Sequence, residues 1–393
     1  MPRNDSFDSF DSFDSFDSFD SFDSFSTHRA GQANGRLAEG LLRSREGHVG
    51  RPVRLGLQTD GAKTLFEPGL VRHWGAHADD CLPAPSARWL ARMAPSVRAQ
   101  LAVADLMQTT RYEPTARTTA PRVCITLGGA TRVDLTRPPL DHFKGQVARV
   151  EAWSALRAER APEILSQLKP WYGYLSSIVH LNPAWTPHTH ELLAVAIEYA
   201  SNVVQRLKYE FVCPRPSDLS PRIQPMIEIP GFFAWPSGHA TQAFMLAELL
   251  STLALRSGGP SDAQWELREQ LWRQADRIAT NRVIAGVHFP TDNHAGAGLG
   301  VVLARFFVHL ASGEAIPPAL GLTLAATGFP DTADFDFRKV QQQSRHAGFN
   351  EHPPKNVDPP APPPLDVKDG DSPLRWLWAQ ALTEWHEPPM PGE

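Results

Sequence analysis

Apolar residues recur at helical spacing along most of the chain between residues 86 and 312. This period predicts successive helices rather than strands. A Pro-rich connection over residues 214–236 interrupts them and is long enough to be functional. The amphipathic segment 374–385, LRWLWAQALTEW, is expected to dock on the helical core, with a partner protein as the alternative. The predicted helices cover residues 86–112, 141–160, 162–180, 188–211, 238–257, 262–285 and 293–312.

One region breaks this helical pattern with two short strand-like runs. VCITL and TRVDL lie within residues 120–137, on either side of Gly128 and Gly129. The arrangement favours a small hairpin. A lone Gly-Gly pair is a weak signal for a phosphate-binding loop, because the rest of that motif is missing.

The two ends of the chain lack the pattern of a packed core. Residues 5–25 repeat Asp-Ser-Phe seven times, and a period of three matches neither a helix nor a strand. We expect this segment to be disordered, with a Phe-rich interaction segment as the alternative. The pattern divides the chain into a disordered tail (1–60), a helical and irregular part with a hairpin (61–140), a catalytic helical core (141–320) and a Pro-rich tail with a short amphipathic helix (321–393).

Composition and charge narrow the class of protein. The chain is 42% hydrophobic and 21% charged, with a net charge of -5, which suits a globular core. It has no basic blocks, so binding to nucleic acid or to an anionic membrane surface is not expected. Cys81, Cys124 and Cys213 are too few and too scattered for a disulfide framework. A reducing, cytoplasmic location is the simplest interpretation.

No secretory signal or membrane span is expected from the sequence. The N-terminus lacks an apolar stretch, and no run reaches the roughly 18–20 apolar residues that a spanning helix needs. The two best candidates, residues 243–255 and 296–311, contain Glu248 in the first and Arg305 and His309 in the second. We interpret both as buried helices of a soluble bundle.

Three segments carry residues suited to holding an oxyanion: KYEFVCPRP (208–216), WPSGHA (235–240) and NRVIAGVHFPTD (281–292). Lys208, Arg215 and Arg282 offer fixed positive charges, and arginine presents a fork of donors that matches oxyanion geometry. Ser237 adds a hydroxyl, and Gly238 adds a main-chain N–H at the predicted start of a helix. Helix N-termini attract anions.

The spacing within the third segment sets a geometric condition. On a continuous helix Arg282 and His288 would lie about 240° apart around the axis. They share a ligand only if the helix bends or ends between them, and Gly286 and Pro290 are placed to cause that. Asp292 follows His288 by four residues and can fix the tautomer of its imidazole.

Together the three segments resemble the three-part signature of the type 2 phosphatidic acid phosphatase and vanadium-dependent haloperoxidase superfamily. The signature positions span residues 208–292, and the resemblance weakens outside about 140–312. One departure is Asn281, which stands where a serine usually precedes the motif arginine. The resemblance implies an all-α helical bundle of the acid phosphatase and vanadium haloperoxidase type.

The resemblance also implies roles for individual residues. His288 would be the covalent group, either forming a phosphohistidine or ligating the vanadium of vanadate. His239 would be the acid–base partner, and Asp292 would orient His288. The oxyanion would be bound by Lys208, Arg215, Ser237, Gly238 and Arg282.

Each of these residues taken alone has a more ordinary interpretation. A single Lys208 or Arg282 at a helix end is usually a solvated charge, and Pro-Ser-Gly is usually a turn into a helix. A single His288 is more often a structural histidine, and Asp292 is more often an N-cap. The functional interpretation therefore depends on the joint occurrence of all three segments.

Two chemistries fit the same residues, because vanadate mimics phosphate in shape and charge. A haloperoxidase would use vanadate as cofactor and hydrogen peroxide and halide as substrates. A soluble acid phosphatase would hydrolyse a phosphate monoester without a cofactor. Phe232, seven residues before His239, and His294 are weaker candidates for a halide or substrate pocket. We favour the haloperoxidase; the third hypothesis is a non-catalytic interaction protein, and a homodimer is implied by resemblance only.

Overall fold

The computed structural model describes residues 59–60, 63–64, 87–114, 121–168, 171–258, 262–316, 320–325, 328–345 and 372–386. The Asp-Ser-Phe segment at 5–25, Cys81 and the Pro-dense segment at 352–364 lie outside these residues. The described part is mainly helical, which confirms the predicted fold class.

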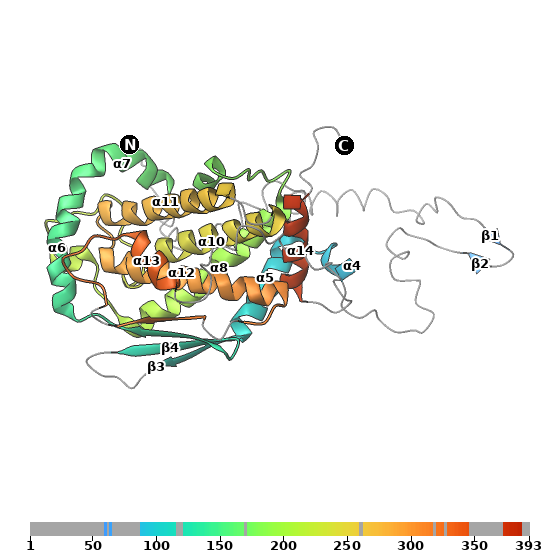
Figure 1. The fold of residues 1–393 in the computed structure, drawn as a ribbon, viewed down its shortest axis with the longest axis horizontal. Helices are drawn as coiled ribbons and strands as arrows, with labels where there is room; N and C mark the ends of the chain where they lie inside the picture. The colour runs from blue at the N-terminus through green and yellow to red at the C-terminus, as the bar shows by residue number, and fades with distance from the viewer. Residues whose placement is uncertain are drawn as a thin grey trace, which may run out of the picture.

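Four long helices form the centre of the molecule and run side by side (Figure 1). Helix α10 packs against the other three. These four long helices confirm the helices predicted from the apolar period. The last one begins three residues earlier than predicted, because a proline is well suited to the first turn of a helix. The four are α8 (Pro187–Phe211), α10 (Gly238–Gly258), α11 (Asp262–Ile284) and α12 (Pro290–Ser312).

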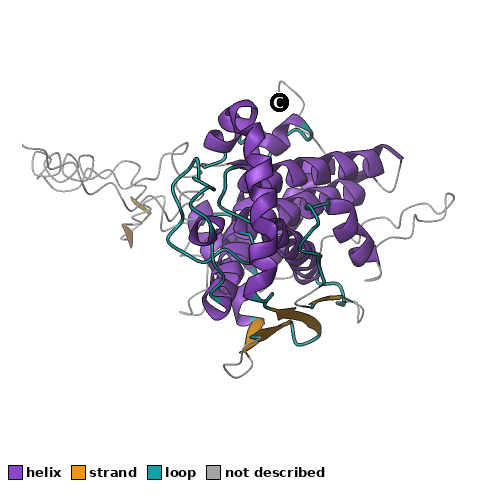
Figure 2. Ribbon diagram, turned by 90° about the vertical axis from the view of Figure 1, so that its left-hand side faces the viewer, coloured by secondary structure: helices purple, strands orange, loops and turns teal. Residues whose placement is uncertain are grey.

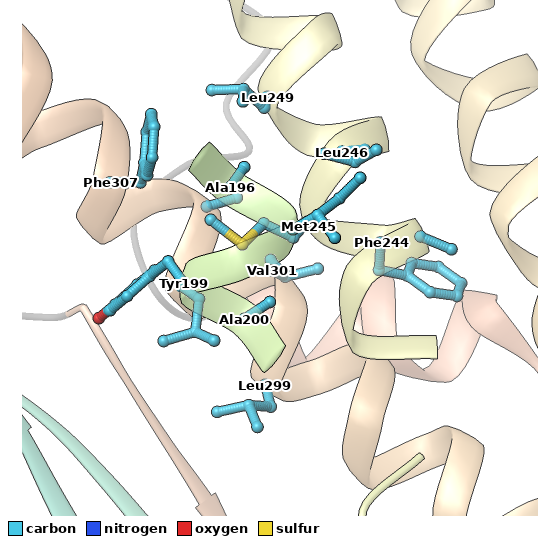
Figure 3. Packing of buried hydrophobic residues seen from close by; sticks show 14 of the residues in the cluster. Ala196, Tyr199, Ala200, Phe244, Met245, Leu246, Leu249, Leu299, Val301 and Phe307 are labelled. Atoms are coloured by element: carbon cyan, nitrogen blue, oxygen red, sulfur yellow. The ribbon is translucent and has the colours of Figure 1, made fainter. Parts of the chain in front are cut away.

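The apolar core lies between these helices (Figure 3). Tyr199 of α8, Phe244 and Met245 of α10, and Val301 of α12 are fully or almost fully buried there. Fully burying such side chains stabilises a fold by roughly 1.5–3 kcal/mol each. The core therefore fixes the relative positions of α8, α10 and α12, which carry parts of all three candidate motifs.

The remaining helical elements are mostly short, and two of the predicted helices end early. The expected helix over 86–112 ends at Gln108, and the chain continues into a strand. The helix predicted over 162–180 stops at Ser166 and is followed by a separate 3₁₀ helix. These elements are α4 (Ala87–Leu90), α5 (Pro95–Gln108), α6 (Leu140–Trp153), η1 (Ser154–Leu156), α7 (Arg157–Ser166), η2 (Trp171–Ser177), α9 (Pro216–Leu219), α13 (Phe337–Arg345) and α14 (Pro373–His386).

A four-stranded sheet lies along one side of the helices (Figure 2). Strands β4 (Arg122–Leu127) and β5 (Thr131–Thr136) form the predicted hairpin, with Val123 opposite Leu135. Strand β3 (Thr110–Pro114) pairs with β4, and β6 (Gly321–Leu324) adds in parallel to β5. Two short strands, β1 (Thr59–Asp60) and β2 (Lys63–Thr64), pair with each other.

Helix α14 docks on the core, as the amphipathic pattern predicted, and crosses one end of the bundle (Figure 1). Its carboxylate Glu384 accepts hydrogen bonds from the main-chain N–H groups of His188 and Thr189 at 2.7 and 2.8 Å. These donors belong to the first turn of α8, where no helical carbonyl is available to them. The C-terminal helix therefore caps the helix that carries the first motif.

Helix α12 is the one helix in the described part of the chain with the length and apolar composition to cross a membrane. In this fold 89% of its most apolar window is buried inside the protein. That burial is typical of a central helix of a globular core.

Candidate active site

The first motif begins on the last turn of α8. Lys208 is almost fully buried, and its ammonium donates to the main-chain carbonyls of Phe233 and Ala234 at 2.6 and 2.8 Å. The helix ends three residues later, and Val212 adopts a left-handed conformation with φ of 50°. This turn leads the chain directly into the connection that carries Arg215.

Arg215 joins the first motif to the third. Its Nη1 donates to the main-chain carbonyl of Val287 at 2.7 Å and lies 3.1 Å from Nε2 of His288. Its Nε and Nη2 donate to the carbonyl of Phe232 at 3.1 and 2.9 Å. The guanidinium is therefore held in one orientation on the imidazole of His288.

His288 and Asp292 form the pair that the spacing predicted. Nδ1 of His288 lies 2.8 Å from Oδ2 of Asp292, and the same oxygen accepts the main-chain N–H of Phe289 at 2.9 Å. A carboxylate accepts hydrogen bonds, so Nδ1 carries the ring proton and Nε2 keeps its lone pair. Nε2 is the nitrogen beside Arg215, where it is available as a nucleophile or ligand.

The turn between α11 and α12 meets the geometric condition that the sequence sets. Helix α11 ends at Ile284, and Gly286 takes a φ of +82°. A Cβ there would lie 2.8 Å from Nη2 of Arg157 and 2.9 Å from Ile223. Glycine is thus required both by the backbone and by the packing, and the break lets Arg282 and His288 approach the same site.

The second motif is tied to the third through the main chain. The N–H of Ser237 donates to the carbonyl of Asp292 at 3.0 Å, and Ser237 is fully buried. Helix α10 begins at Gly238, as predicted, so its N-terminus lies at the site. A Cβ on Gly238 would meet only Val204, at 3.9 Å. Packing therefore does not require glycine here, whereas close approach of a ligand to the main chain would.

Arg282 is almost fully buried but only partly bonded. Its Nη2 donates to Oε1 of Gln167 at 2.9 Å and to the carbonyl of Ile164 at 3.2 Å. Its Nε and Nη1 have no partner among the described residues. Buried donors are rarely left unpaired, and two unpaired guanidinium donors suit an oxyanion.

His239 is half-buried beside Arg282 on the first turn of α10. Its Nε2 lies 3.3 Å from the main-chain carbonyl of Gln167 and donates to it. Burial and the charge of Arg282 lower the pKa of His239. Since Gly238 is half-buried too, the site reaches the molecular surface at these two residues.

The comparison with protein families addresses the same part of the chain. Residues 189–315 match the family model described as the PAP2 superfamily, and all three motifs lie within this range. Over this segment the chain is similar to the PAP2 superfamily. A comparison with curated proteins gives no significant match. Members of this superfamily are generally enzymes, phosphatases or haloperoxidases, so the match points to an enzyme that handles phosphate-like oxyanions.

The electrostatics of the PAP2 motifs show how closely their charges converge. The pKa of His288 is lowered by burial and by the charges of Arg215, Lys208, His239 and Arg282. Burial and Arg215 lower the pKa of Lys208, whereas burial raises that of Asp292. Three basic side chains, those of Lys208, Arg215 and Arg282, thus face the carboxylates of Asp292 and Asp218.

The two weaker site predictions have different outcomes. The ring of Phe232 lies 4.9 Å from the ammonium of Lys208 and 5.2 Å from the guanidinium of Arg215, so it borders the PAP2 motifs. His294 packs on Phe329 instead, with ring centroids 4.8 Å apart. None of the described contacts of His294 is with a motif residue, because its place on α12 turns it toward the 328–345 segment.

Sequence analysis missed Gln167, which contacts two PAP2 motif residues. It lies just after α7, inside the segment that was predicted as one helix over 162–180, and no local signal marked it. Asn281, the departure from the family pattern, donates to Glu163 at 2.8 Å and to Gln167 at 3.1 Å. The asparagine therefore connects α11 to the end of α7.

Proposed function

We propose that this protein is a vanadium-dependent haloperoxidase-type enzyme that oxidises halide with hydrogen peroxide. The observation on which the proposal rests is the joint position of the unprotonated Nε2 of His288, which accepts from Arg215, and the unpaired donors of Arg282. They belong to one cluster with Lys208 and Arg215. Such a cluster combines a ligand for a metal atom with donors for the oxygens around it.

The residues fit vanadate on the grounds of charge and donor type. Nε and Nη1 of Arg282 are orphaned in the described structure, and the side chains of Lys208, Arg215 and Arg282 outnumber the carboxylates of Asp292 and Asp218. A multiply charged oxyanion would satisfy both conditions. Vanadate would be held by Lys208, Arg215, Ser237, Gly238 and Arg282, with Nε2 of His288 as its protein ligand, and when bound it would supply a Lewis acid for activating peroxide.

The state of His239 favours the peroxidase. Burial and the charge of Arg282 lower its pKa, so the ring starts unprotonated, the form that a proton acceptor needs, and a bound oxyanion would offset the charge of Arg282 and strengthen it as a base. Hydrogen peroxide must lose protons as it reacts, and His239 lies at the exposed side of the site. Phe232, stacked on Lys208 and Arg215, would shield that side from water and present its positive ring edge to a halide.

A phosphatase is the second candidate, and the His288–Asp292 pair favours it. Nε2 of His288 would attack phosphorus while the bond to the ester oxygen breaks, and His239 would donate a proton to the departing alcohol. Water would then hydrolyse the phosphohistidine. This role needs a protonated His239, which the surrounding cations oppose until a dianionic substrate is bound.

A paired assay tests the proposal. The protein is first given orthovanadate, bromide and hydrogen peroxide, and halogenation of an organic acceptor is measured. Hydrolysis of p-nitrophenyl phosphate is then measured without vanadate. We expect vanadate-dependent halogenation that is lost in His288→Ala while the helical circular dichroism is retained. Hydrolysis without halogenation would contradict the peroxidase, and absence of both activities would favour a non-catalytic protein.

A further inference from the structure

Gln167 lies outside all three motifs, yet it joins two of them. The residue is fully buried just after α7. Its side-chain oxygen accepts from Nη2 of Arg282 at 2.9 Å and from Nδ2 of Asn281 at 3.1 Å. Its main-chain oxygen accepts from Nε2 of His239 at 3.3 Å. One residue thus contacts the motif arginine of α11 and the motif histidine of α10.

These contacts determine how Arg282 presents its donors. Arginine has several rotatable bonds, and ordering it in one geometry requires fixed partners. Here the oxygens of Gln167 and Ile164 take Nη2. Nε and Nη1 remain unpaired among the described residues. Gln167 is itself held by Asn281, which also bonds Glu163.

The amide partner of Arg282 contrasts with the carboxylate partners of two other buried arginines. Buried Arg98 pairs with Glu191 at 2.6 Å, and buried Arg268 pairs with Glu248 at 3.1 Å. In the described part of the chain no carboxylate is bonded to Arg282. The amide oxygen of Gln167 orients the guanidinium without neutralising its charge.

We propose that Gln167 is a positioning residue that aims Arg282 at the bound oxyanion and keeps its full positive charge available. The inference rests on the proposed oxyanion site and applies equally to a peroxidase and a phosphatase. It assigns to Gln167 a role in affinity for the anion, beyond the packing of α7 on α11.

The first test compares two truncations by calorimetric titration with orthovanadate, alongside thermal unfolding. Gln146 is the matched control, because it is equally buried and its oxygen accepts one bond, from the main-chain N–H of Thr291 at 3.2 Å. Both Gln167→Ala and Gln146→Ala should lower the melting temperature. Only Gln167→Ala should also weaken orthovanadate binding, by about tenfold or more, as expected for misplacing a donor to a charged group. Equal affinity in the two variants would overturn the proposal.

The variant Gln167→Glu distinguishes the orientation of Arg282 from the charge of Arg282 as the cause of anion binding. A carboxylate can still accept from Arg282 and Asn281, so we expect the folded protein to be at least as stable as Gln167→Ala. Its orthovanadate affinity should nevertheless fall by about tenfold or more, because the carboxylate neutralises Arg282 and repels the anion. Affinity equal to wild type would contradict the proposal. If the wild-type protein itself bound no orthovanadate, the proposed function would fail first, and the inference with it.

Discussion

At the scale of single residues, Asp292 makes three hydrogen bonds, each with a different structural role. One of its oxygens accepts both the ring N–H of His288 and the main-chain N–H of Phe289. Its main-chain carbonyl also accepts from Ser237. The same residue therefore fixes the tautomer of the proposed ligand, caps α12 and ties the second motif to the third.

Replacing Asp292 with asparagine tests the first of these duties. Asn can still accept the N–H of Phe289, but it no longer places a negative charge on Nδ1 of His288. We expect orthovanadate affinity to fall by roughly 10–100-fold, the usual range for loss of a partner that orients a metal-bound histidine. The measurement is calorimetric titration, with circular dichroism as a check on the fold. Unchanged affinity in a folded variant would contradict the role assigned to Asp292.

His294 provides a pH-dependent prediction. It is buried, neither ring nitrogen has a partner among the described residues, and burial lowers its pKa to about 4. Below its usual pKa of about 6.5 the unfolded chain takes up a proton that the folded chain refuses. Stability contributed by neutral His294 is therefore present above pH 6.5 and is lost as pH falls toward 4.

When the pH is lowered from 7 to 5, protonation of His294 in the unfolded chain should reduce the free energy of unfolding by about 2 kcal/mol. The variant His294→Phe keeps an aromatic ring against Phe329 and removes the titration. We expect its urea-unfolding free energy to decline less than that of wild type over this range. Parallel declines in the two proteins would show that His294 is not the group responsible.

The site residues predicted from the sequence are those of the three motifs, where the types of side chain and their spacing suit an oxyanion site. The predicted meeting of Lys208, Arg215 and His288 is observed, because the chain breaks at Gly286 as the spacing of the third motif required. The weak candidate His294 packs on Phe329, and Gln167 was not predicted from the sequence. Which side of a helix faces a site, and which residue from another element reaches it, depend on tertiary packing that local spacing does not encode.

At the scale of elements, the contact between α10 and α12 is unusually close. A Cβ at Gly300 would lie 2.2 Å from the main-chain carbonyl of Thr241, and one at Gly296 would lie 2.5 Å from that of Ser237. Both obstacles are backbone atoms, so a small side chain could not be accommodated without moving a helix. This approach keeps Ser237 in contact with Asp292.

We therefore expect Gly300→Ala to lower the free energy of unfolding by about 1–3 kcal/mol, the usual cost of overpacking, and to weaken orthovanadate binding. The control is Gly298→Ala, whose Cβ would meet only side-chain atoms of Leu322 at 3.4 and 3.5 Å. That variant should be neutral or slightly stabilising, because alanine favours the helix. Chemical denaturation measures both, and equal stability of the two variants would refute the close-packing argument.

The bounds of α8, α10 and α11 were predicted almost correctly, because the residues buried in these helices follow the apolar period of the sequence. The predicted helix over 162–180 ends at Ser166, and Pro170, inside the predicted range, has no N–H with which to continue a helix. The hairpin of β4 and β5 was predicted from its alternation and its Gly-Gly turn. Strands β3 and β6 were not predicted: β3 begins inside the range predicted as a helix up to residue 112, and β6 pairs with the distant strand β5.

At the scale of the whole molecule, the ends of the described chain hold the core together. Arg98 of α5 pairs with Glu191 of α8 and lies 4.9 Å from the ring of Trp376 of α14. Glu384 of α14 accepts bonds from the first turn of α8. Helix α8 carries Lys208 at its other end. It is held in place by residues 98 and 384, which lie almost 300 positions apart in the sequence.

Glu384→Gln should loosen this clamp. Glutamine has one acceptor oxygen in place of two, so the donors of His188 and Thr189 cannot all be satisfied. We expect a loss of about 1–3 kcal/mol in unfolding free energy, the cost of leaving buried donors unpaired. The control is Glu314→Gln, which breaks a surface pair with Arg256 and should change stability by less than about 1 kcal/mol. Equal effects would rule out a special role for Glu384.

The central claim is that groups from three separated segments form one oxyanion site around His288. A crystal structure of the protein grown with orthovanadate tests it most directly. We predict the anion within bonding distance of Nε2 of His288, with Nε or Nη1 of Arg282 and the ammonium of Lys208 donating to its oxygens. An anion bound elsewhere, or a His288 that stays paired only with Arg215 and Asp292 at saturating orthovanadate, would contradict the account.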